Sequence, residues 1–297
     1  MSVLLEIATI IAPLFVIAGI GFAWGRSGMP FDTNMIGSLV VNFAVPCLIF
    51  STLTRLEVDI SDFGAAAGMF SLAVGANIVV SAILLRVMSR DIGAFLPATV
   101  FANTGNMGLP LCLFAFGDEG LALGISIFVV SASANFLLGV SFVSGKFSLR
   151  ETIMAPHLYV VVAALGFLFA EVQPPAWLAN TTYIIGGMSI PLMLVALGVS
   201  LARLTVSSFG QSFILGLYRL GFGLGIGLTL SWFFELEGIA RGVLILQCAM
   251  PSAVLNYIIA ARYDRKPDEI AGLVVGSTFV SLATLPLLLL VAIQGPG

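Results

Sequence analysis

The chain has 297 residues, of which 59% are hydrophobic and only 9% are charged, and its net charge is −3 at pH 7. Soluble domains carry about 25% charged residues, so this composition excludes a water-soluble globular protein and indicates an integral membrane protein. The acidic balance also argues against nucleic-acid binding, which needs basic surfaces.

Ten apolar stretches follow one another along the chain, and each is a predicted membrane-spanning helix, which needs about 20 residues. The sixth is short, and the fourth and ninth contain helix breakers. The first has no basic residue before it and no small-residue cleavage site close behind it, so we expect a membrane helix rather than a signal peptide. The predicted helices cover residues 5–25, 35–54, 63–86, 92–116, 120–143, 156–171, 178–201, 208–234, 239–261 and 270–293.

Lysine and arginine residues are distributed unevenly between the connections. With the N-terminus outside, the inward connections hold nine of these cations and the outward connections hold only two, Arg55 and Arg241. Because cytoplasmic loops are enriched in Lys and Arg, we predict that both termini lie outside.

Three prolines of the first half recur in the second half at offsets of 143, 145 and 141 residues. This spacing predicts a duplication, with one repeat in residues 1–143 and another in residues 144–297. Each repeat would hold five helices, an odd number, so the second must cross the membrane in the opposite orientation. Inverted repeats are typical of secondary transporters, whose substrates bind where broken helices meet. The paired prolines are Pro13 with Pro156, Pro46 with Pro191, and Pro110 with Pro251.

The stretch FANTGNMGLP, residues 101–110, places helix breakers and polar side chains inside the fourth helix. Proline removes a backbone donor, glycine disfavours a helix, and irregular backbone survives in hydrocarbon only where it faces protein or a wet cavity. We therefore predict unwound backbone at mid-depth here, and LQCAMPSAVLNY, residues 246–257, predicts the same in the ninth helix. The candidate residues at a crossing of the two helices are Asn103, Thr104, Gly105, Asn106, Gly108, Pro110, Gln247, Pro251, Ser252 and Asn256.

The half-helix that follows each break would aim backbone N–H groups and a partial positive charge at the crossing, which suits an anion. A purely structural alternative stays open, namely a proline kink whose asparagines pair with neighbouring helices.

Four further polar residues are accessory candidates. Arg219, the one charge deep in the apolar stretches, would either bind a carboxylate or pair with helix-end carbonyls. Asn42, Asn77 and Asn135 would line a cavity or form interhelical hydrogen bonds.

The sequence contains no candidate residues for catalysis or for metal binding. The three cysteines lie in apolar stretches without metal-ligand spacing, and the single histidine, His157, has no second histidine and no nearby cysteine. We therefore predict no enzyme, no metal site and no cofactor.

These motifs resemble the auxin efflux carrier family, which includes bacterial malate and malonate permeases and the plant PIN carriers. The resemblance covers essentially the whole chain and is most specific in NTGNMGLP, which is followed by an apolar stretch and GDEG. It extends to the pattern from Asn42 to Pro46, to PLMLVALGVSL from Pro191 and to QCAMPSAVLNYIIA from Gln247. The chain lacks the long central cytoplasmic loop of PIN carriers, so it is closer to the short bacterial members.

The resemblance implies an all-α membrane fold of ten helices in two inverted five-helix repeats, similar to that of the bile acid sodium symporters. It implies a scaffold subdomain of helices 1, 2, 6 and 7 and a transport subdomain of helices 3–5 and 8–10 with the crossed helices four and nine. It further implies elevator-type transport of small organic anions, such as auxin- or malate-like carboxylates, by a protein of the bacterial inner membrane that is often a homodimer.

The family's functional positions transfer by motif to the two broken helices. The acidic residue that some plant members carry on helix three has no counterpart here, and Asn77 is nearest to it. Two other functions stay open, a sodium-coupled symporter of the bile acid type and a non-transporting membrane sensor. The transferred positions are Asn103, Asn106, Pro110 and Pro251, with Gln247 and Asn256 as weaker matches.

Overall fold

The computed structural model describes residues 3–55, 60–147, 149, 153–203 and 209–293. This part of the chain is helical throughout, apart from connections and one isolated β-bridge, which confirms the all-α prediction. The helices of the first half are α1 Val3–Arg26, α2 Thr33–Leu39, η1 Val40–Ala44, α3 Val45–Arg55, α4 Ile60–Val87, α5 Ile92–Val100, η2 Thr104–Gly108, α6 Leu109–Ala134, η3 Asn135–Gly139 and α7 Val140–Ser144. Those of the second half are α9 Pro156–Phe169, α10 Ala176–Gly186, α11 Ser189–Arg203, α12 Phe209–Phe233, α13 Gly238–Cys248, α14 Val254–Arg262 and α15 Pro267–Ile293.

All ten predicted stretches fall on described helices, but they differ in length. Seven helical segments of the described chain are long and apolar enough to cross a membrane. The remaining predicted stretches correspond to the shorter helices α5, α9, α13 and α14. The arrangement of ten spans in inverted repeats therefore stays a prediction.

Three five-residue segments, η1, η2 and η3, are π-helical and interrupt or precede longer α-helices. Each contains one of the asparagines singled out in the sequence, Asn42, Asn106 and Asn135 respectively. π-helical turns within α-helices are frequent at functional sites. The sequence patterns gave no indication of these segments.

The predicted boundary between the fourth and fifth helices is present as a kink within α6. Gly117, in the GDEG motif, has φ 65° and ψ −155°, a backbone conformation that is readily accessible only to glycine. The chain turns there without a long connection.

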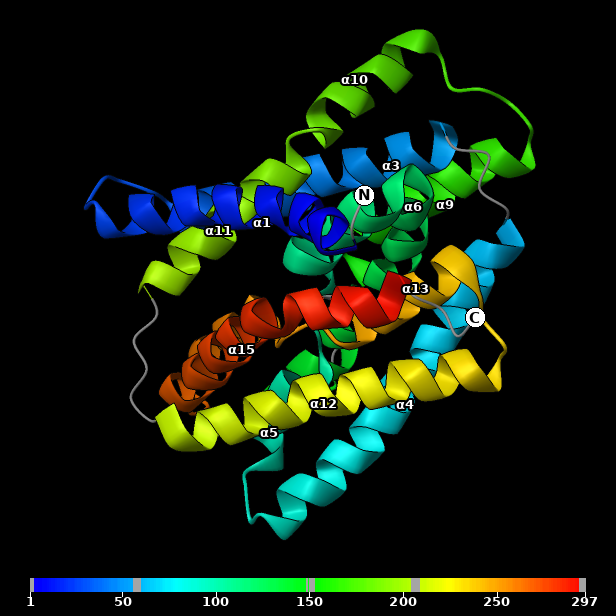
Figure 1. The fold of residues 1–297 in the computed structure, drawn as a ribbon. Coiled ribbons are helices and arrows are strands. Elements are labelled where there is room, and N and C mark those ends of the chain that lie inside the picture. The colour runs from blue at the N-terminus through cyan, green and yellow to red at the C-terminus, as the bar shows by residue number, and fades with distance from the viewer. Residues whose placement is uncertain (1–2, 56–59, 148, 150–152, 204–208, 294–297) are drawn as a thin grey trace.

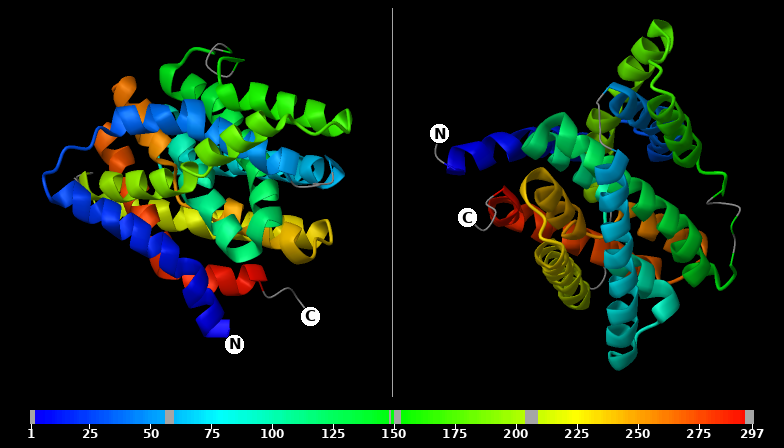
Figure 2. Two further views of the ribbon diagram at one scale, coloured as in Figure 1. Left: turned by 90° about the horizontal axis from the view of Figure 1, so that it is seen from above. Right: turned by 90° about the vertical axis from the view of Figure 1, so that its right-hand side faces the viewer.

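The helices pack in two groups, which Figure 1 shows on opposite sides of the molecule. In the first helix group, α1 packs along α11, and α3 packs against α9 and α10. In the second helix group, α12 packs against α13 and α15, while α4 packs against α5. α6 packs against α4 and α13 and also contacts α1 and α3, so it touches both groups. The start of α1 and the end of α15 lie near one another on one side of the molecule (Figure 2).

The core contains two large buried clusters, and the broken helices contribute to both. Leu111 of α6 and Leu246 of α13 belong to a buried cluster that includes α1, α3 and α11. Cys112 of α6 and Leu244 of α13 belong to a second cluster that includes α4, α12 and α15. The two interrupted helices are therefore buried between the helix groups.

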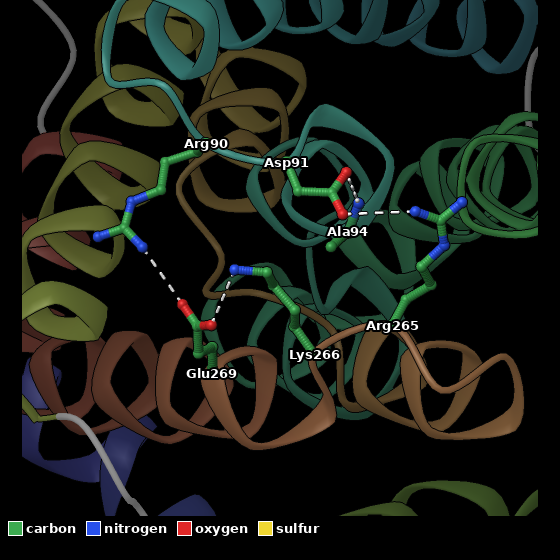
Figure 3. A network of polar contacts seen from close by, with 6 residues as sticks. All are labelled: Arg90, Asp91, Ala94, Arg265, Lys266 and Glu269. Atoms are coloured by element: carbon green, nitrogen blue, oxygen red, sulfur yellow. Dashed lines mark hydrogen bonds and ion pairs between the residues drawn. The ribbon is translucent and has the colours of Figure 1, made fainter.

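Ion pairs join the connection before α5 to the connection before α15 (Figure 3). Asp91 accepts a hydrogen bond from the backbone N–H of Ala94 at the start of α5, and it pairs with Arg265 at 3.4 Å. Glu269 pairs with Arg90 at 3.3 Å and with Lys266 at 3.1 Å. Partly exposed pairs contribute only about 0–1 kcal/mol each, so they fix the relative position of these helix ends more than they stabilise the fold.

Close backbone contact between α1 and α11 depends on small residues. A Cβ atom added to Gly198 would overlap the carbonyl oxygen of Ala18, and one added to Gly21 would overlap that of Val195. Small residues at such contacts let membrane helices approach closely.

Gly198→Ala is expected to lower the thermal unfolding midpoint of the purified protein in detergent, because overpacking of this kind costs about 1–3 kcal/mol. Gly19→Ala is the matched control, since the space around Gly19 on α1 is open, and it should leave the midpoint unchanged or raise it slightly. Equal midpoints for the two variants would contradict the close packing of α1 and α11.

Candidate functional site

Two interrupted helices meet at their breaks. The first is extended between the end of α5 at Val100 and the start of η2 at Thr104, and the second is irregular between the end of α13 at Cys248 and the start of α14 at Val254. Figure 1 shows α5 and α13 entering this region from different directions. The breaks predicted from both sequence motifs are therefore present.

The two breaks satisfy each other's backbone groups. Ala102 and Ser252 form an isolated antiparallel bridge. The backbone N–H of Asn103 donates to the carbonyl of Pro251 at 2.7 Å, and that of Ala253 donates to the carbonyl of Phe101 at 3.1 Å. Each helix thus supplies the partners that the other lost where it was interrupted.

The break in the first interrupted helix lies earlier than predicted. Pro110 lies in continuous helix, because η2 runs directly into α6 with helical backbone at Gly108, whereas Pro251 lies within the second break. The bridge at the crossing pairs residues 102 and 252, and the correspondence of Pro110 with Pro251 in the sequence repeat stays a prediction. Gly105 and Gly108 lie in η2 rather than in unwound chain.

Gly108 leaves room for a neighbouring side chain and does not interrupt the helix. A Cβ atom at Gly108 would overlap the side-chain oxygen of Gln247, and one at Gly105 would lie 2.9 Å from the ring of Phe128. Close approach of Gln247 to η2 brings the two predicted motifs together.

Asn256 is the centre of a buried hydrogen-bond network at the crossing. Its amide nitrogen donates to the Phe101 carbonyl at 3.0 Å and to the Ser252 hydroxyl at 3.1 Å, and its amide oxygen accepts from Asn135 at 3.0 Å. The backbone N–H of Ser252 donates in turn to the hydroxyl of Ser277 on α15 at 3.1 Å. Asn135 and Asn256 therefore fit the structural alternative, in which asparagines pair with neighbouring helices.

Other side-chain atoms at the crossing are buried without a partner. They include the amide nitrogen of Asn103 and the amide oxygen of Gln247. The nitrogen of Gln247 has only a weak contact with the sulfur of Cys112 at 3.5 Å. Leaving a buried polar group unpaired costs about 1–3 kcal/mol, so these atoms are candidates for contact with a ligand. Thr104 is buried in η2, and Asn106 is partly exposed between buried neighbours.

The ends of the four half-helices differ in how they are capped. The N-terminal ends of η2 and α14 have no side-chain cap. At the C-terminal end of α5, Asn77 donates to the Val100 carbonyl at 3.4 Å, and at that of α13, Arg219 donates to the Cys248 carbonyl at 3.1 Å. The negative helix ends are therefore capped while the positive ends are left for another group, which favours an anion.

The accessory candidates separate into two kinds. Asn77, Asn135 and Arg219 are buried and bonded to the crossing as described. Asn42 is exposed, and its amide donates to the carbonyl of Ser38 in its own helix at 2.9 Å, so the structure does not bring it to the crossing.

A cavity of about 740 Å³ opens between α1, α3, α10, α11 and the first part of α6. Its polar lining includes Ser51, Thr52, Arg55 and Asp118, and the guanidinium of Arg55 lies 4.1 Å from the ring centre of Tyr183. The distribution of Lys and Arg in the sequence identifies Arg55 only as a cation of an outward connection. Tyr183 is far from it in the chain, so no local pattern could have indicated this pair.

Within the described residues, no group of three or more His, Cys, Asp or Glu side chains is placed to hold a metal ion.

Asn256→Ala is expected to lower the thermal unfolding midpoint clearly. It leaves the buried Asn135 amide nitrogen without its partner, at about 1–3 kcal/mol, and it removes the hydrogen bonds of Asn256 to the Phe101 carbonyl and the Ser252 hydroxyl. Asn42→Ala serves as the control, since it removes only an exposed bond within one helix. If both variants unfold at the wild-type temperature, the network does not hold the crossing together.

Comparison with known proteins agrees with this architecture. The sequence matches the family described as membrane transport protein over residues 6–144 and 140–289. It is 27% identical over 267 residues to an uncharacterized transporter of Methanothermobacter thermautotrophicus, across 86% of this chain and 88% of the relative. It is 23% identical over 279 residues to an uncharacterized transporter of Methanocaldococcus jannaschii, with coverage of 86% and 88%. It is 21% identical over 310 residues to a protein of Rhizobium meliloti provisionally named a malonate transporter, across 94% of each chain.

Because the family match spans nearly the whole sequence, the chain belongs to the membrane transport protein family, that of the auxin efflux carriers, and is a multi-pass membrane transporter rather than an enzyme.

Proposed function

We propose that this protein is a secondary carrier of small organic anions and that the helix crossing is its substrate site. The observation that carries this proposal is the pair of half-helix N-termini, η2 and α14, that meet at the crossing without side-chain caps. Anions bind readily at such ends, where free N–H groups and the positive end of the helix dipole coincide. The unpaired amide groups of Asn103 and Gln247 would complete the site.

The substrate class follows from the chemistry of these groups. Backbone N–H groups and amide nitrogens donate hydrogen bonds to carboxylate oxygens, and amide oxygens accept them from a hydroxyl or a protonated acid. We therefore propose malate-, malonate- or auxin-like carboxylates as substrates. The provisional name of the Rhizobium meliloti relative supports malonate as the first compound to test.

Alternating access would arise from movement of the second helix group against the first. In this elevator-type proposal, α1, α3, α9, α10 and α11 are the scaffold, and the second helix group with α6 carries the crossing. The cavity near Arg55 lies between the scaffold helices and α6 and would admit the substrate from one side. Assembly as a homodimer in a bacterial inner membrane, with both termini outside, belongs to the same proposal and rests on the family resemblance.

A sodium-coupled symporter of the bile acid type is supported less well. Sodium binds to oxygen ligands, and carboxylates are the strongest of these in proteins. Among the described residues, the side chains bonded at the crossing are amides, hydroxyls and the cation of Arg219. Uptake that requires sodium would favour the sodium-coupled symporter over a carrier that does not use sodium. Membership of a transporter family favours transport over a sensor role.

Asn106→Ala is expected to abolish uptake of radiolabelled malonate into proteoliposomes while leaving the yield and thermal unfolding midpoint unchanged. Asn106 is the partly exposed amide of η2, so its loss removes a ligand contact more than it disturbs packing. Asn180→Ala, at an exposed position of α10, is the matched control and should transport normally.

The same assay should be run with malate and indole-3-acetate, and with sodium replaced by potassium. Undiminished uptake by the Asn106→Ala variant would contradict the crossing as the substrate site.

A further inference from the structure

Arg219 is the largest fully buried side chain of the described residues, with 2% of its surface exposed. It lies on α12, and one of its terminal nitrogens donates to the Cys248 carbonyl at 3.1 Å. Cys248 is the last residue of α13, just before the break that contains Pro251. The guanidinium is therefore fixed directly behind the crossing.

Two glycines allow this contact. A Cβ atom at Gly223 would overlap the Cys248 carbonyl oxygen, and one at Gly227 would lie 3.1 Å from the Cα atom of Ile245. Gly223 and Gly227 follow Arg219 by about one and two helical turns, so they bring α12 close to the end of α13. Gly223 and Gly227, two of the four glycines in GFGLGIG at residues 221–227, therefore allow the close approach of α12 to α13, whereas the space around Gly221 and Gly225 is open.

Among the described residues, no carboxylate forms an ion pair with Arg219. Its Nε and remaining Nη atoms are buried without a partner. Arginine stays protonated in proteins, so the only compensating groups seen here are backbone carbonyls at the negative end of α13.

Tyr218, the residue before Arg219, is linked to the C-terminal end of α5 by a chain of uncharged hydrogen-bonding groups. The Tyr218 hydroxyl lies 2.9 Å from that of Ser81, which donates to the oxygen of Asn77 at 2.9 Å. Asn77 in turn donates to the Val100 carbonyl at the end of α5. α12 therefore positions the caps of both negative helix ends, but only one of these caps is charged.

We infer that Arg219 is a positioning residue that sets the charge of the crossing and thereby selects anions by their valence. This inference rests on the proposed function, and it makes dicarboxylates the preferred substrate class. The buried cation holds the end of α13 and leaves a net positive potential at the uncapped ends of η2 and α14. A divalent anion gains twice as much from this potential as a monovalent anion.

The size of the effect follows from Coulomb's law. One unit charge at ~10 Å and an effective dielectric constant of ~20 changes affinity roughly tenfold per anion charge. Removal of the charge should therefore weaken binding of a divalent anion about tenfold more than binding of a monovalent anion.

The test measures inhibition of radiolabelled malonate uptake by unlabelled malonate, which is divalent at pH 8, and by acetate, which is monovalent. In the Arg219→Gln variant, the preference for malonate over acetate should fall about tenfold. Ser81→Ala, which breaks the neutral chain to α5, is the matched control and should leave the preference unchanged even if it slows uptake.

Arg219→Lys gives a second measurement if the glutamine variant does not fold. A buried ammonium group can lose its proton, whereas the guanidinium of arginine keeps it. The preference for malonate should then be near wild type at pH 7 and should fall as the pH is raised to 9, while wild type shows no such change. A merely structural role for Arg219 would produce no valence dependence in either variant.

The outcomes separate the two proposals. If wild type is active and Arg219→Gln loses affinity for malonate and acetate equally, the role of Arg219 is overturned but the proposed function is not. The same holds if the preference of Arg219→Lys for malonate does not change with pH. Wild-type protein that takes up no radiolabelled carboxylate and is not stabilised by any of them overturns the proposed function and this inference together.

Discussion

Backbone groups in hydrocarbon must find partners within the protein, and the rest of this structure depends on how two broken helices meet that requirement. The N–H of Asn103 pairs with the Pro251 carbonyl, and the N–H of Ala253 pairs with the Phe101 carbonyl. Neither break could be satisfied in this way without the other. Burial of the interrupted helices between both core clusters follows from the same constraint, because lipid offers no hydrogen bonds to irregular chain.

The crossing brings together two N-terminal and two C-terminal ends of half-helices. Their positive and negative partial charges would cancel if all four ends were capped, or all four left uncapped. The capping of these ends differs, since Asn77 and Arg219 cap the C-terminal ends of α5 and α13, while η2 and α14 begin without side-chain caps. The excess of positive potential that we propose at the crossing would link the fold to the proposed anion carrier. Asn256 holds this arrangement together without adding charge, because its amide serves as donor and acceptor at once.

Much of this could be predicted from the sequence, because hydropathy and helix breakers are local signals. The helical class, the helix boundary at residues 116–120 and the existence of breaks in the fourth and ninth predicted helices all follow from such signals. Pro110 lies inside the helix that begins at Thr104 rather than in the break, and no local signal distinguishes these two positions of a proline. The bond from Arg219 to the Cys248 carbonyl and the approach of Arg55 to Tyr183 depend on contacts between distant residues, which no local pattern records. The inverted repeat and the subdomain movement remain predictions.

The central claim is that an anion binds at the N-terminal ends of η2 and α14. Electron cryo-microscopy of the purified protein in lipid nanodiscs with saturating malonate tests this most directly. Density for the dicarboxylate is expected between these helix ends, in contact with Asn103 or Asn106. Malonate density confined to the cavity beside Arg55 and Tyr183, with the crossing unoccupied, would contradict it.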